Sequence, residues 1–434
     1  MTTPDPFERE LPAGPDPVAV FQALGKAEGS VLFERPGEPG RAVIALDPVT
    51  VAVGSGTTVR WTRGPIRPGL DDAAVPEALR GTAGTPAVCV LGGDALRDRP
   101  AGPPHSVLLF PSVLIRFEGD AVRLTGPSLS RLDELAGQVT GAAPMTPLES
   151  TVLTPGTHFD SDIDDGAYRR LIELAHARVV AGEARQVTIS RRFVVPSAAD
   201  PLTVYRVLRA GNPSPYHFLL RLPGVTLVGA SPQGLVEVRG REVSVPVIAG
   251  TRPRGADPAQ DEALAAELIA DPKERDEHAM LVELARADLA GVAEPGTVRV
   301  ADGSPEVHRY ARVMHLVSEV TGTLAAGRTA VDALTAVLPA GTVAGTPRAA
   351  ALRLIDELEP VPRGLYGGGV GWVSAGGDID FCLGIRTLQM RDGAAYCQAG
   401  AGVVAGSEPD REVRESRDKA SALFAALATA APLR

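Results

Sequence analysis

Residues 167–196 read AYRRLIELAHARVVAGEARQVTISRRFVVP, and their pattern indicates one helix and one strand. In residues 167–181 the apolar side chains recur at helical spacing. The stretch after them alternates, so that Val187 and Ile189 share one face of a strand while Gln186 lies on the other. The segment therefore predicts a helix followed by a strand, with Gln186 pointing away from the core side.

The same two patterns continue on both sides of this segment. Between residues 18 and 139, short apolar runs alternate with turns rich in Gly and Pro, as in a sheet. The later sequence predicts strands at residues 225–230, 242–248, 367–373, 379–388 and 395–404, and helices at residues 261–293, 346–359 and 410–430. Strands in runs with helices grouped between them predict an α+β sandwich.

A connection separates two parts of the chain. Residues 141–165 are rich in Pro, Thr and Asp, which favour turns and loops. We therefore expect residues 1–140 to form an amino-terminal segment of the sandwich, and residues 166–434 to form the region that carries the chemistry.

The composition limits the classes of function. The chain has 434 residues, with 43 Lys+Arg against 53 Asp+Glu, and its formal net charge is -10. This acidic balance argues against DNA or RNA as a partner, because nucleic-acid binding neutralises phosphates with a basic face. Three cysteines without a CxxC pair favour neither a disulfide framework nor a zinc ribbon. No stretch approaches the ~20 apolar residues that cross a bilayer, so we expect a cytoplasmic protein without a membrane partner.

Two helical turns each offer a pair of carboxylates. Glu274 and Glu277 share one face of a predicted helix, and Glu412 and Glu415 repeat this arrangement near the carboxyl end. Two such helices could converge on a hard divalent cation, and Mg²⁺ prefers one or two direct carboxylates with waters and substrate oxygens. From spacing alone, a solvated acidic face explains the same pattern. Lys419 is either the partner of Glu415 in an exposed helix pair or a cation for an anionic substrate.

Three glycine-rich segments let backbone amides approach a ligand. They are GTRPRG from Gly250, GTVAGTPR from Gly341 and QAGAG from Gln398. In the second, Thr346 is predicted to cap a helix whose first position is Pro347, which leaves exposed N–H groups that favour an anion. For each segment alone a turn or a bulge is the simpler explanation, and only their concurrence favours an anion site.

Two further side chains are ambiguous from the residues alone. In the strand predicted around Arg386, Cys382 and Gly384 share its face, so Arg386 emerges from a face without bulk and could grip a carboxylate. A surface ion pair is the alternative. His315 stands in the apolar run VMHLV, where a histidine is by default a core residue and becomes a catalytic candidate only if it faces the same cleft.

Taken together, the motifs resemble the chorismate-utilising enzymes, most closely the large subunit, component I, of anthranilate synthase. They run from about Tyr168 to Leu427 and are QVTISRRF, NPSPYHF, GASP, PVIAGTRPRG, DPKERDEHAMLVELARADL, RYARVMHLVSEVTG, LPAGTVAGTPR, RGLYGGGVGW, QAGAGVVAGSEPDRE and DKA. Relatives include aminodeoxychorismate, aminodeoxyisochorismate, isochorismate and salicylate synthases. The resemblance implies two large, mostly antiparallel sheets packed as a sandwich with helices outside. It is looser in residues 1–140, a region that is regulatory in relatives.

The resemblance also implies roles for individual residues. Glu277 and Glu415 match direct ligands of a catalytic Mg²⁺, with Glu274 and Glu412 in supporting acidic positions. His315 and Thr342 match residues beside the ring where the aromatising elimination occurs. The positions that match substrate contacts are Gly250, Thr251, Tyr366, Arg386, Gly400, Gly402 and Lys419, of which Arg386 and Lys419 address carboxylates.

Two positions favour ammonia as the nucleophile. Water-using relatives have a lysine where this chain has Gln186, because water needs a general base before it attacks ring carbon 2. Aminodeoxychorismate synthases have a nucleophilic lysine where this chain has Ala249. The resemblance therefore implies anthranilate formation from chorismate, with ammonia from solution or from a separate glutamine amidotransferase subunit. The alternatives are release of 2-amino-2-deoxyisochorismate and, disfavoured by Gln186, synthesis of isochorismate or salicylate.

Two departures from the family pattern affect this expectation. Relatives have a glutamate that protonates the departing 4-hydroxyl where this chain has Gln233, which has no acidic proton to release. Slow turnover, or a chorismate-binding homologue impaired in catalysis, is therefore a further alternative. Feedback-regulated anthranilate synthases bind tryptophan with a Leu-Leu-Glu-Ser segment, but this chain has Arg35 at the position of the serine, so we expect insensitivity to tryptophan.

Overall fold

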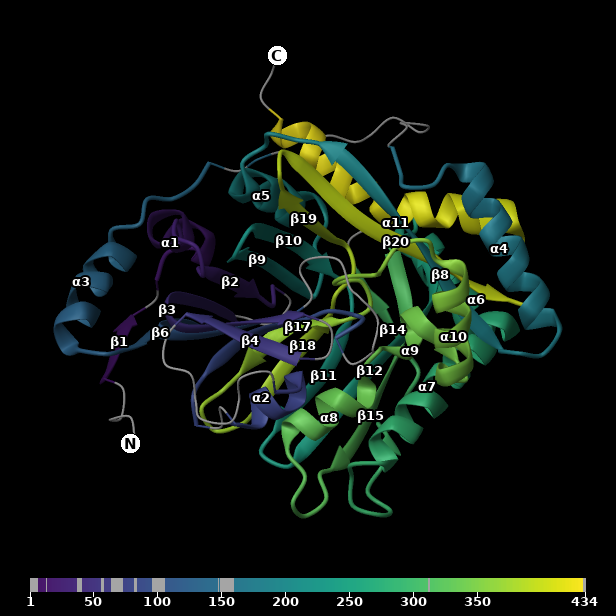
Figure 1. Cartoon of the computed structure of the whole chain (residues 1–434), viewed down its shortest axis with the longest axis horizontal. Helices are drawn as coiled ribbons and strands as arrows, with labels where there is room; N and C mark the ends of the chain where they lie inside the picture. The colour runs from purple at the N-terminus through teal and green to yellow at the C-terminus, as the bar shows by residue number, and fades with distance from the viewer. Residues whose placement is uncertain are drawn as a thin grey trace.

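The computed structural model describes residues 7–12, 14–36, 41–55, 58–63, 73–81, 84–95, 106–146, 148, 160–310 and 313–431. In this part of the chain the strands form one continuous hydrogen-bonded network, in which the paired strands run antiparallel. Figure 1 shows the strands at the centre and the helices around them. The predicted α+β class is confirmed.

Two long strands, β3 (Ala42–Ser55) and β6 (Ser106–Glu118), belong to both halves of the network. They pair with each other, but their register shifts between Pro48 and Thr50, where a bulge bends the pair. Strand β2 pairs with the first half of β3, and β4 pairs with its second half. The network therefore divides at this bend into two arms, which we call the β20 arm and the β15 arm.

Each arm is a row of hydrogen-bonded neighbours. The order in the β20 arm is β1 (Phe7–Pro12), β7 (Ala121–Gly126), β6, β3, β2 (Val31–Glu34), β9 (Tyr216–Leu222), β10 (Val225–Ser231), β19 (Thr387–Arg391), β20 (Ala394–Val404), β8 (Gln186–Pro196) and β16 (Gly345–Thr346). The order in the β15 arm is β4 (Thr58–Arg63), β3, β6, β5 (Ala87–Leu91), β17 (Gly369–Val373), β18 (Ile379–Leu383), β11 (Gly234–Arg239), β12 (Glu242–Pro253) and β15 (Val313–Thr323). The free edge of β15 pairs with β13 (Arg299–Val300) and β14 (Glu306–Arg309).

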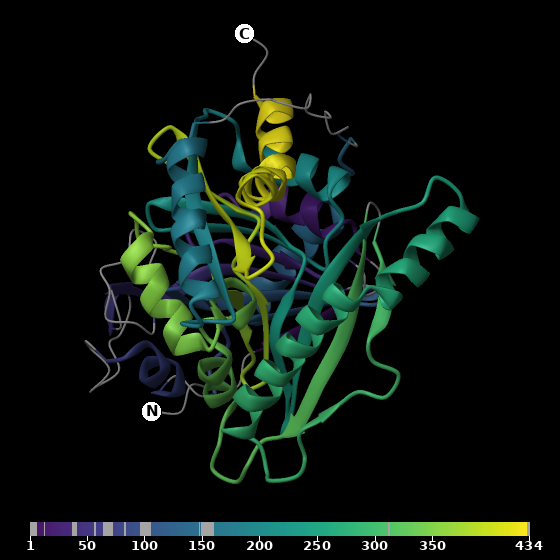
Figure 2. The ribbon, with the colours of Figure 1, turned by 90° about the vertical axis from the view of Figure 1, so that its right-hand side faces the viewer.

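Helices cover the outer faces of both arms. The β20 arm carries α1 (Pro17–Leu24), α3 (Leu129–Thr140), α4 (Asp165–Val180), α5 (Pro201–Gly211), α10 (Arg348–Leu358) and α11 (Pro409–Ala430). The β15 arm carries α2 (Val75–Gly81), α6 (Pro258–Ala270), α7 (Pro272–Ala290) and α8 (Ala330–Val337). The short helix α9 (Gly341–Ala344) contacts β8 and α10 of the β20 arm as well as α7 of the β15 arm. Figure 2 shows α4 and α10 on one side of the strands and α6 and α7 on the other. Within the described residues, no helix is both long and apolar enough to cross a membrane.

A separate apolar cluster lies between the two arms. It includes Val31 and Phe218 from the β20 arm together with Val90, Val370 and Cys382 from the β15 arm. Because both arms contribute side chains, they face each other across this layer. The two sheets implied by the family resemblance are nevertheless arms of one network, so a sandwich of two separate sheets is not confirmed.

Two predictions about helices need correction. The helix predicted over residues 261–293 is two helices, because Asp271 ends α6 and Pro272 begins α7. Thr346 does not cap a helix; it pairs with β8 as part of β16, and Pro347 is the residue before α10.

The predicted connection at residues 141–165 lies partly outside the described residues, namely at 147 and 149–159. Its last residue, Asp165, is the first residue of α4. Strands from the first 140 residues pair with later ones, as β2 does with β9 and β5 with β17. The division into an amino-terminal segment, a connection and a catalytic region stays a prediction.

Candidate active site

Helices α7 and α11 place the two acidic pairs within electrostatic reach of each other. Burial raises the pKa of Glu277, and the carboxylates of Glu274 and Glu415 raise it further. Burial first and Glu415 second raise the pKa of Glu412 to about 6. Carboxylates shift one another's pKa in this way only when they lie close together. Glu412 is only 6% exposed and the Glu274 side chain 17%, whereas the Glu415 side chain is 40% exposed, so of these three only Glu412 and Glu274 are shielded from full solvation.

These carboxylates suit a cation that takes few protein ligands. Among the described residues, no group of three or more His, Cys, Asp or Glu side chains lies close enough to hold a metal ion. Mg²⁺ typically takes one or two carboxylates and completes its octahedron with waters and substrate oxygens. Crowded carboxylates on two helices therefore fit this ion, with Glu277 and Glu415 as the predicted direct ligands.

Arg252 of the GTRPRG segment holds Glu274. Its guanidinium lies 3.5 Å from Glu274 Oε1, and it donates to Asp271 Oδ2 at 2.7 Å and to Glu267 Oε1 at 2.9 Å. The backbone of Gly250, whose φ is 73°, lies so close to this carboxylate that a Cβ there would be 3.3 Å from Glu274 Oε2. Glu274 is therefore engaged by an arginine, which suits the supporting position predicted for it.

Arg191 on β8 anchors the turn of α11 that carries Glu412 and Glu415, and sequence reasoning missed it. Its buried side chain donates to Val413 O at 3.3 Å and to Ser416 Oγ at 2.9 Å. The signal was present in the sequence, because Arg191 falls on the core-facing side of its strand. A cation there must be paired, since an unpaired buried charge is very costly.

Lys419 connects α11 to a flat surface on β20. Its Nζ donates to Gly400 O at 3.0 Å and forms an ion pair with Glu415 at 2.6 Å. A Cβ at Gly400 would lie 2.4 Å from a carbonyl oxygen of β8, and a Cβ at Gly402 would lie 2.8 Å from Gln186 Nε2. Position 400 therefore requires glycine, whereas a Cβ at Gly402 would displace the end of the Gln186 side chain. We call Gly400 and Gly402 the glycine floor.

His315 on β15 is a neutral base held by a backbone carbonyl. Its Nδ1 lies 3.0 Å from Gly250 O and 3.1 Å from Thr251 Oγ1. Because a carbonyl can only accept, Nδ1 carries the proton and Nε2 keeps a free lone pair. Burial lowers the pKa of His315, and the positive charge of Arg386 lowers it further. His315 is therefore unprotonated at Nε2 and lies near the predicted carboxylate-binding arginine.

Arg386 is a half-buried cation in the loop between β18 and β19. Its φ of 50° ends the strand that was predicted to run through it, so Arg386 does not share a strand face with Cys382 and Gly384. Its guanidinium makes no ion pair within the part of the chain that the structure describes, so the alternative of a surface ion pair is not found. Burial lowers the pKa of Arg386, while the buried Tyr366 hydroxyl and the carboxylate of Glu415 act in the opposite direction. A half-buried guanidinium that makes no ion pair among the described residues is suited to bind an anionic ligand.

Gln186 and Thr342 bury polar atoms that lack a partner among the described residues. These atoms are Gln186 Oε1 and Thr342 Oγ1. Gln186 lies on the strand face predicted for it, but it is only 4% exposed. Thr188 Oγ1, on the same face, donates to Thr342 O at 3.4 Å and brings both residues into one region. Because an unsatisfied buried polar group costs about 1–3 kcal/mol, these atoms favour a hydrogen-bonding ligand.

Gln233 lies at the bend between β10 and β11, beside the loop that carries Arg386. Its carbonyl accepts a hydrogen bond from Leu383 N at 3.0 Å, and Ala230 N donates to Arg386 O at 3.1 Å. The backbone of Gln233 is therefore hydrogen-bonded to the end of β18, three residues before the predicted carboxylate-binding arginine.

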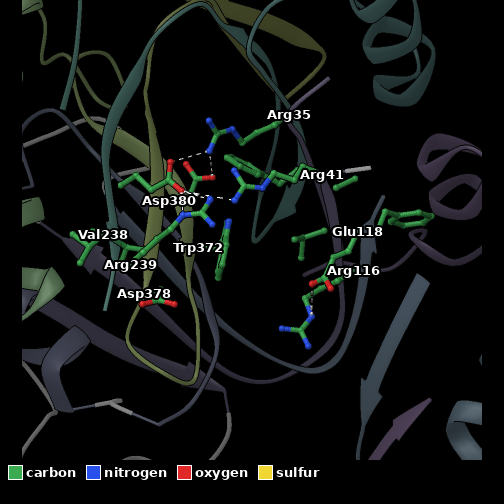
Figure 3. A pocket seen from close by; sticks show the side chains of 15 residues that line it. Arg35, Arg41, Arg116, Glu118, Val238, Arg239, Trp372, Asp378 and Asp380 are labelled. Atoms are coloured by element: carbon green, nitrogen blue, oxygen red, sulfur yellow. Dashed lines mark hydrogen bonds and ion pairs between the residues drawn. The ribbon is translucent and has the colours of Figure 1, made fainter. Parts of the chain in front are cut away.

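A pocket of about 260 Å³ lies elsewhere, where the end of β2 meets the β15 arm (Figure 3). None of the predicted catalytic, substrate or metal residues lines it, whereas Arg35 and Trp372 do. Arg35 donates to Asp380 Oδ2 at 3.0 Å and to Glu237 Oε2 at 3.1 Å, as the dashed lines in Figure 3 show for this cluster. Arg35 thus neutralises the buried carboxylate of Asp380 and ties one arm to the other.

Comparison with known proteins gives a consistent result. A family model described as chorismate binding enzyme matches residues 91–425. Anthranilate synthase component 1 of Mycolicibacterium smegmatis is 46% identical over 312 residues, which make up 70% of this chain and 59% of that protein. The chain thus spans about six tenths of the length of the curated relatives it matches.

Solved structures share the fold. Anthranilate synthase component I of Streptococcus pneumoniae superposes with a TM-score of 0.77 at 30% identity, covering 89% of this chain and 92% of that one. The menaquinone-specific isochorismate synthase of Escherichia coli superposes with a TM-score of 0.74 at 24% identity, covering 98% of this chain and 96% of that one. At that identity, the second likeness concerns the arrangement of strands and helices alone.

Proposed function

The chain belongs to the family of chorismate binding enzymes, and from this premise we propose that it converts chorismate and ammonia to anthranilate, pyruvate and water. The observation that carries the choice of ammonia is Gln186. This amide is buried beside the glycine floor, at the position where water-using relatives have a lysine. An amide cannot deprotonate water, whereas ammonia attacks without first losing a proton.

The charges around the glycine floor suit a dicarboxylate. Arg386, which has no ion pair among the described residues, would bind one carboxylate of chorismate through two parallel hydrogen bonds. Mg²⁺ bound by Glu277 and Glu415 would neutralise the ring carboxylate. Lys419 adds a compact positive charge beside it, at the carbonyl of Gly400.

In the first step, ammonia attacks ring carbon 2 and the 4-hydroxyl leaves. The carbon–nitrogen bond forms, the two ring double bonds shift, and the bond from carbon 4 to oxygen breaks. Gln186 Oε1 accepts a hydrogen bond from ammonia and so directs its lone pair at the ring. Gln233 can hydrogen-bond the leaving hydroxyl but cannot protonate it. The new ammonium group on carbon 2 releases one proton to solvent, and solvent delivers one proton to the leaving hydroxyl to complete the water molecule.

In the second step, His315 Nε2 removes the proton from carbon 2. The electron pair forms the double bond between carbons 2 and 3, and the bond from carbon 3 to the enolpyruvyl oxygen breaks. Enolpyruvate leaves and takes up a proton to become pyruvate, while the ring becomes aromatic. The neutral tautomer that Gly250 O imposes on His315 is the form that this step requires.

Ammonia would come from solution or from a separate glutamine amidotransferase subunit. The relatives carry the name component 1, which supports a second component for them. By analogy we propose the same kind of partner here.

Product analysis tests the proposed function. The purified chain is incubated with chorismate and Mg²⁺, with and without ammonium, and the products are separated by mass. We expect anthranilate only when ammonium is present. Isochorismate or salicylate without ammonium would contradict the role of Gln186, and 2-amino-2-deoxyisochorismate as the final product would mean that the second step does not occur. No consumption of chorismate at any pH would favour a binding homologue impaired at Gln233.

Replacing Gln233 with glutamate should raise turnover. We expect Gln233→Glu to increase kcat at least tenfold, since general acid catalysis is typically worth ~10²- to 10⁴-fold. Steady-state rates at saturating chorismate and ammonium measure the gain. Gln389→Glu, on the neighbouring strand β19, makes the same chemical change away from the site and should leave kcat unchanged. An unchanged rate in Gln233→Glu would refute the assignment of this position to the leaving hydroxyl.

Tryptophan should not inhibit this chain. Arg35 stands where tryptophan-binding relatives have a serine, and its guanidinium is already committed to Asp380 and Glu237. We expect anthranilate formation to change by less than about twofold with added tryptophan, against the 5- to 150-fold typical of allosteric coupling. Rates measured across a tryptophan titration check this expectation, and strong inhibition would show that Arg35 does not block the effector.

A further inference from the structure

Gln398 on β20 is a buried amide that the proposed mechanism does not use. It is 6% exposed, and its Oε1 has no hydrogen-bond partner among the described residues. Its Nε2 donates to Ser190 Oγ on the neighbouring strand β8 at 2.8 Å. The amide is therefore half satisfied, with its acceptor end buried and unused.

A buried ion pair sets the orientation of this amide. Glu359 Oε1 accepts hydrogen bonds from Ser190 N and from Ser190 Oγ, both at 2.8 Å, and the same carboxylate is paired with the buried Arg363. A carboxylate held by an arginine can only accept, so the Ser190 hydroxyl donates its proton to Glu359. The oxygen of Ser190 is then left to accept, and Gln398 must present its NH₂ group to it. The carbonyl oxygen of Gln398 is thereby turned away from this network.

The face that holds Gln398 is the face of the glycine floor. Side chains alternate along β20, so Gln398, Gly400 and Gly402 lie on one side of the strand. The opposite side packs against helices, as Val403 does against α4 and α10. Gln186, whose Oε1 is also unpartnered within the described residues, lies over Gly402. The glycine floor thus has a buried amide acceptor near each end.

We propose that Gln398 is a further substrate-side residue, whose carbonyl oxygen accepts a hydrogen bond from a small donor held over the glycine floor. The donor is an N–H of ammonia or an O–H of the ring substrate, which share this chemistry. The inference rests on the proposed function and deepens it, because it adds a second amide to the one predicted to orient the nucleophile. Because neither amide is a base, the two carbonyl oxygens can orient a hydrogen-bond donor but cannot deprotonate it.

Gln398→Met tests the inference, because methionine has a similar length but no carbonyl acceptor. We expect an increase of about tenfold in one of two constants, the size that the loss of a hydrogen bond to a buried acceptor commonly has. If the donor is ammonia, the KM for ammonium rises and the Kd of chorismate, measured by calorimetry with Mg²⁺ and without ammonium, stays constant. If the donor is the ring hydroxyl, the Kd of chorismate rises.

Two further variants serve as controls. Gln389→Met makes the same change on β19 and should leave both constants unaltered. Ser190→Ala keeps the carbonyl of Gln398 but releases its NH₂ group, so it should give a smaller increase in the same constant as Gln398→Met. Thermal unfolding shows which variants keep the native fold.

The outcomes separate this inference from the proposed function. If folded Gln398→Met keeps both constants within about twofold of the unaltered chain, a difference too small for a lost hydrogen bond, the inference is overturned. If the unaltered chain binds chorismate but does not convert it, the proposed function has failed. The ring hydroxyl is then the only donor left to consider, so the Kd of chorismate alone tests the inference. A tenfold rise in Kd then supports the inference, and an unchanged Kd overturns it.

Discussion

Glu277→Gln should abolish most of the Mg²⁺-dependent activity while leaving the protein folded. We expect kcat/KM to fall about 10³-fold, since a metal ion that neutralises substrate charge contributes several kcal/mol to a reaction of this kind. The stability of the fold should not fall along with kcat/KM. The pKa of Glu277 is raised by burial and by the carboxylates of Glu274 and Glu415, so the charged form is unfavourable in the folded chain without a cation.

Three measurements check this expectation. Initial rates across a Mg²⁺ titration give kcat/KM, calorimetry gives Mg²⁺ affinity without turnover, and thermal unfolding without Mg²⁺ gives stability. Glu283→Gln on the same helix is the matched control, because its side chain is 72% exposed and is paired with Arg286. A loss of less than tenfold in Glu277→Gln would remove this residue from the set of direct ligands.

His315→Asn should separate the two chemical steps. Amination does not need the imidazole, whereas proton removal from carbon 2 does, so we expect anthranilate formation to fall ~10²- to 10⁴-fold with accumulation of 2-amino-2-deoxyisochorismate. Because burial and Arg386 lower the pKa of His315, its base form prevails at neutral pH. Elimination in the unaltered chain should therefore slow only as the pH falls below about 6.5, the ordinary value for histidine.

Single-turnover product analysis by mass follows both species. His176→Asn on α4 provides the control, because that ring lies on an outer helix and contacts the carbonyl of Ala405. Undiminished anthranilate formation by His315→Asn would assign the proton transfer to another group.

The sequence predicted most elements of the fold because the apolar spacing that marks a strand or a helix survives without tertiary information. The strands predicted at residues 225–230 and 395–404 correspond to β10 and β20. The single strand predicted at residues 379–388 is instead β18, a loop and β19, because the positive φ of Arg386 leaves no trace in the alternation of apolar residues. The family resemblance is confirmed by the family match.

The candidate site was only partly visible in the sequence. Spacing identified the pairs around Glu277 and Glu415, but it could not show that their carboxylates come within electrostatic reach of each other, which depends on the packing of both helices on the sheet. The core-facing position of Arg191 in its strand indicated that this arginine must be paired, but it could not show that the partners lie on α11. The commitment of Arg35 to Asp380 was equally hidden, because the two residues meet only when the two arms fold against each other.

The sharing of β3 and β6 between the arms affects how this chain can fold as it is synthesised. β2 emerges early but pairs with β9, and β5 must wait for β17, which lies near the carboxyl end. Until those partners arrive, the edges of the early strands stay open, and open strand edges invite pairing with other chains. Contacts between segments so far apart in sequence also make folding slow. The feature that joins the two arms in the finished protein thus leaves the nascent chain exposed to aggregation until nearly all of it has been made.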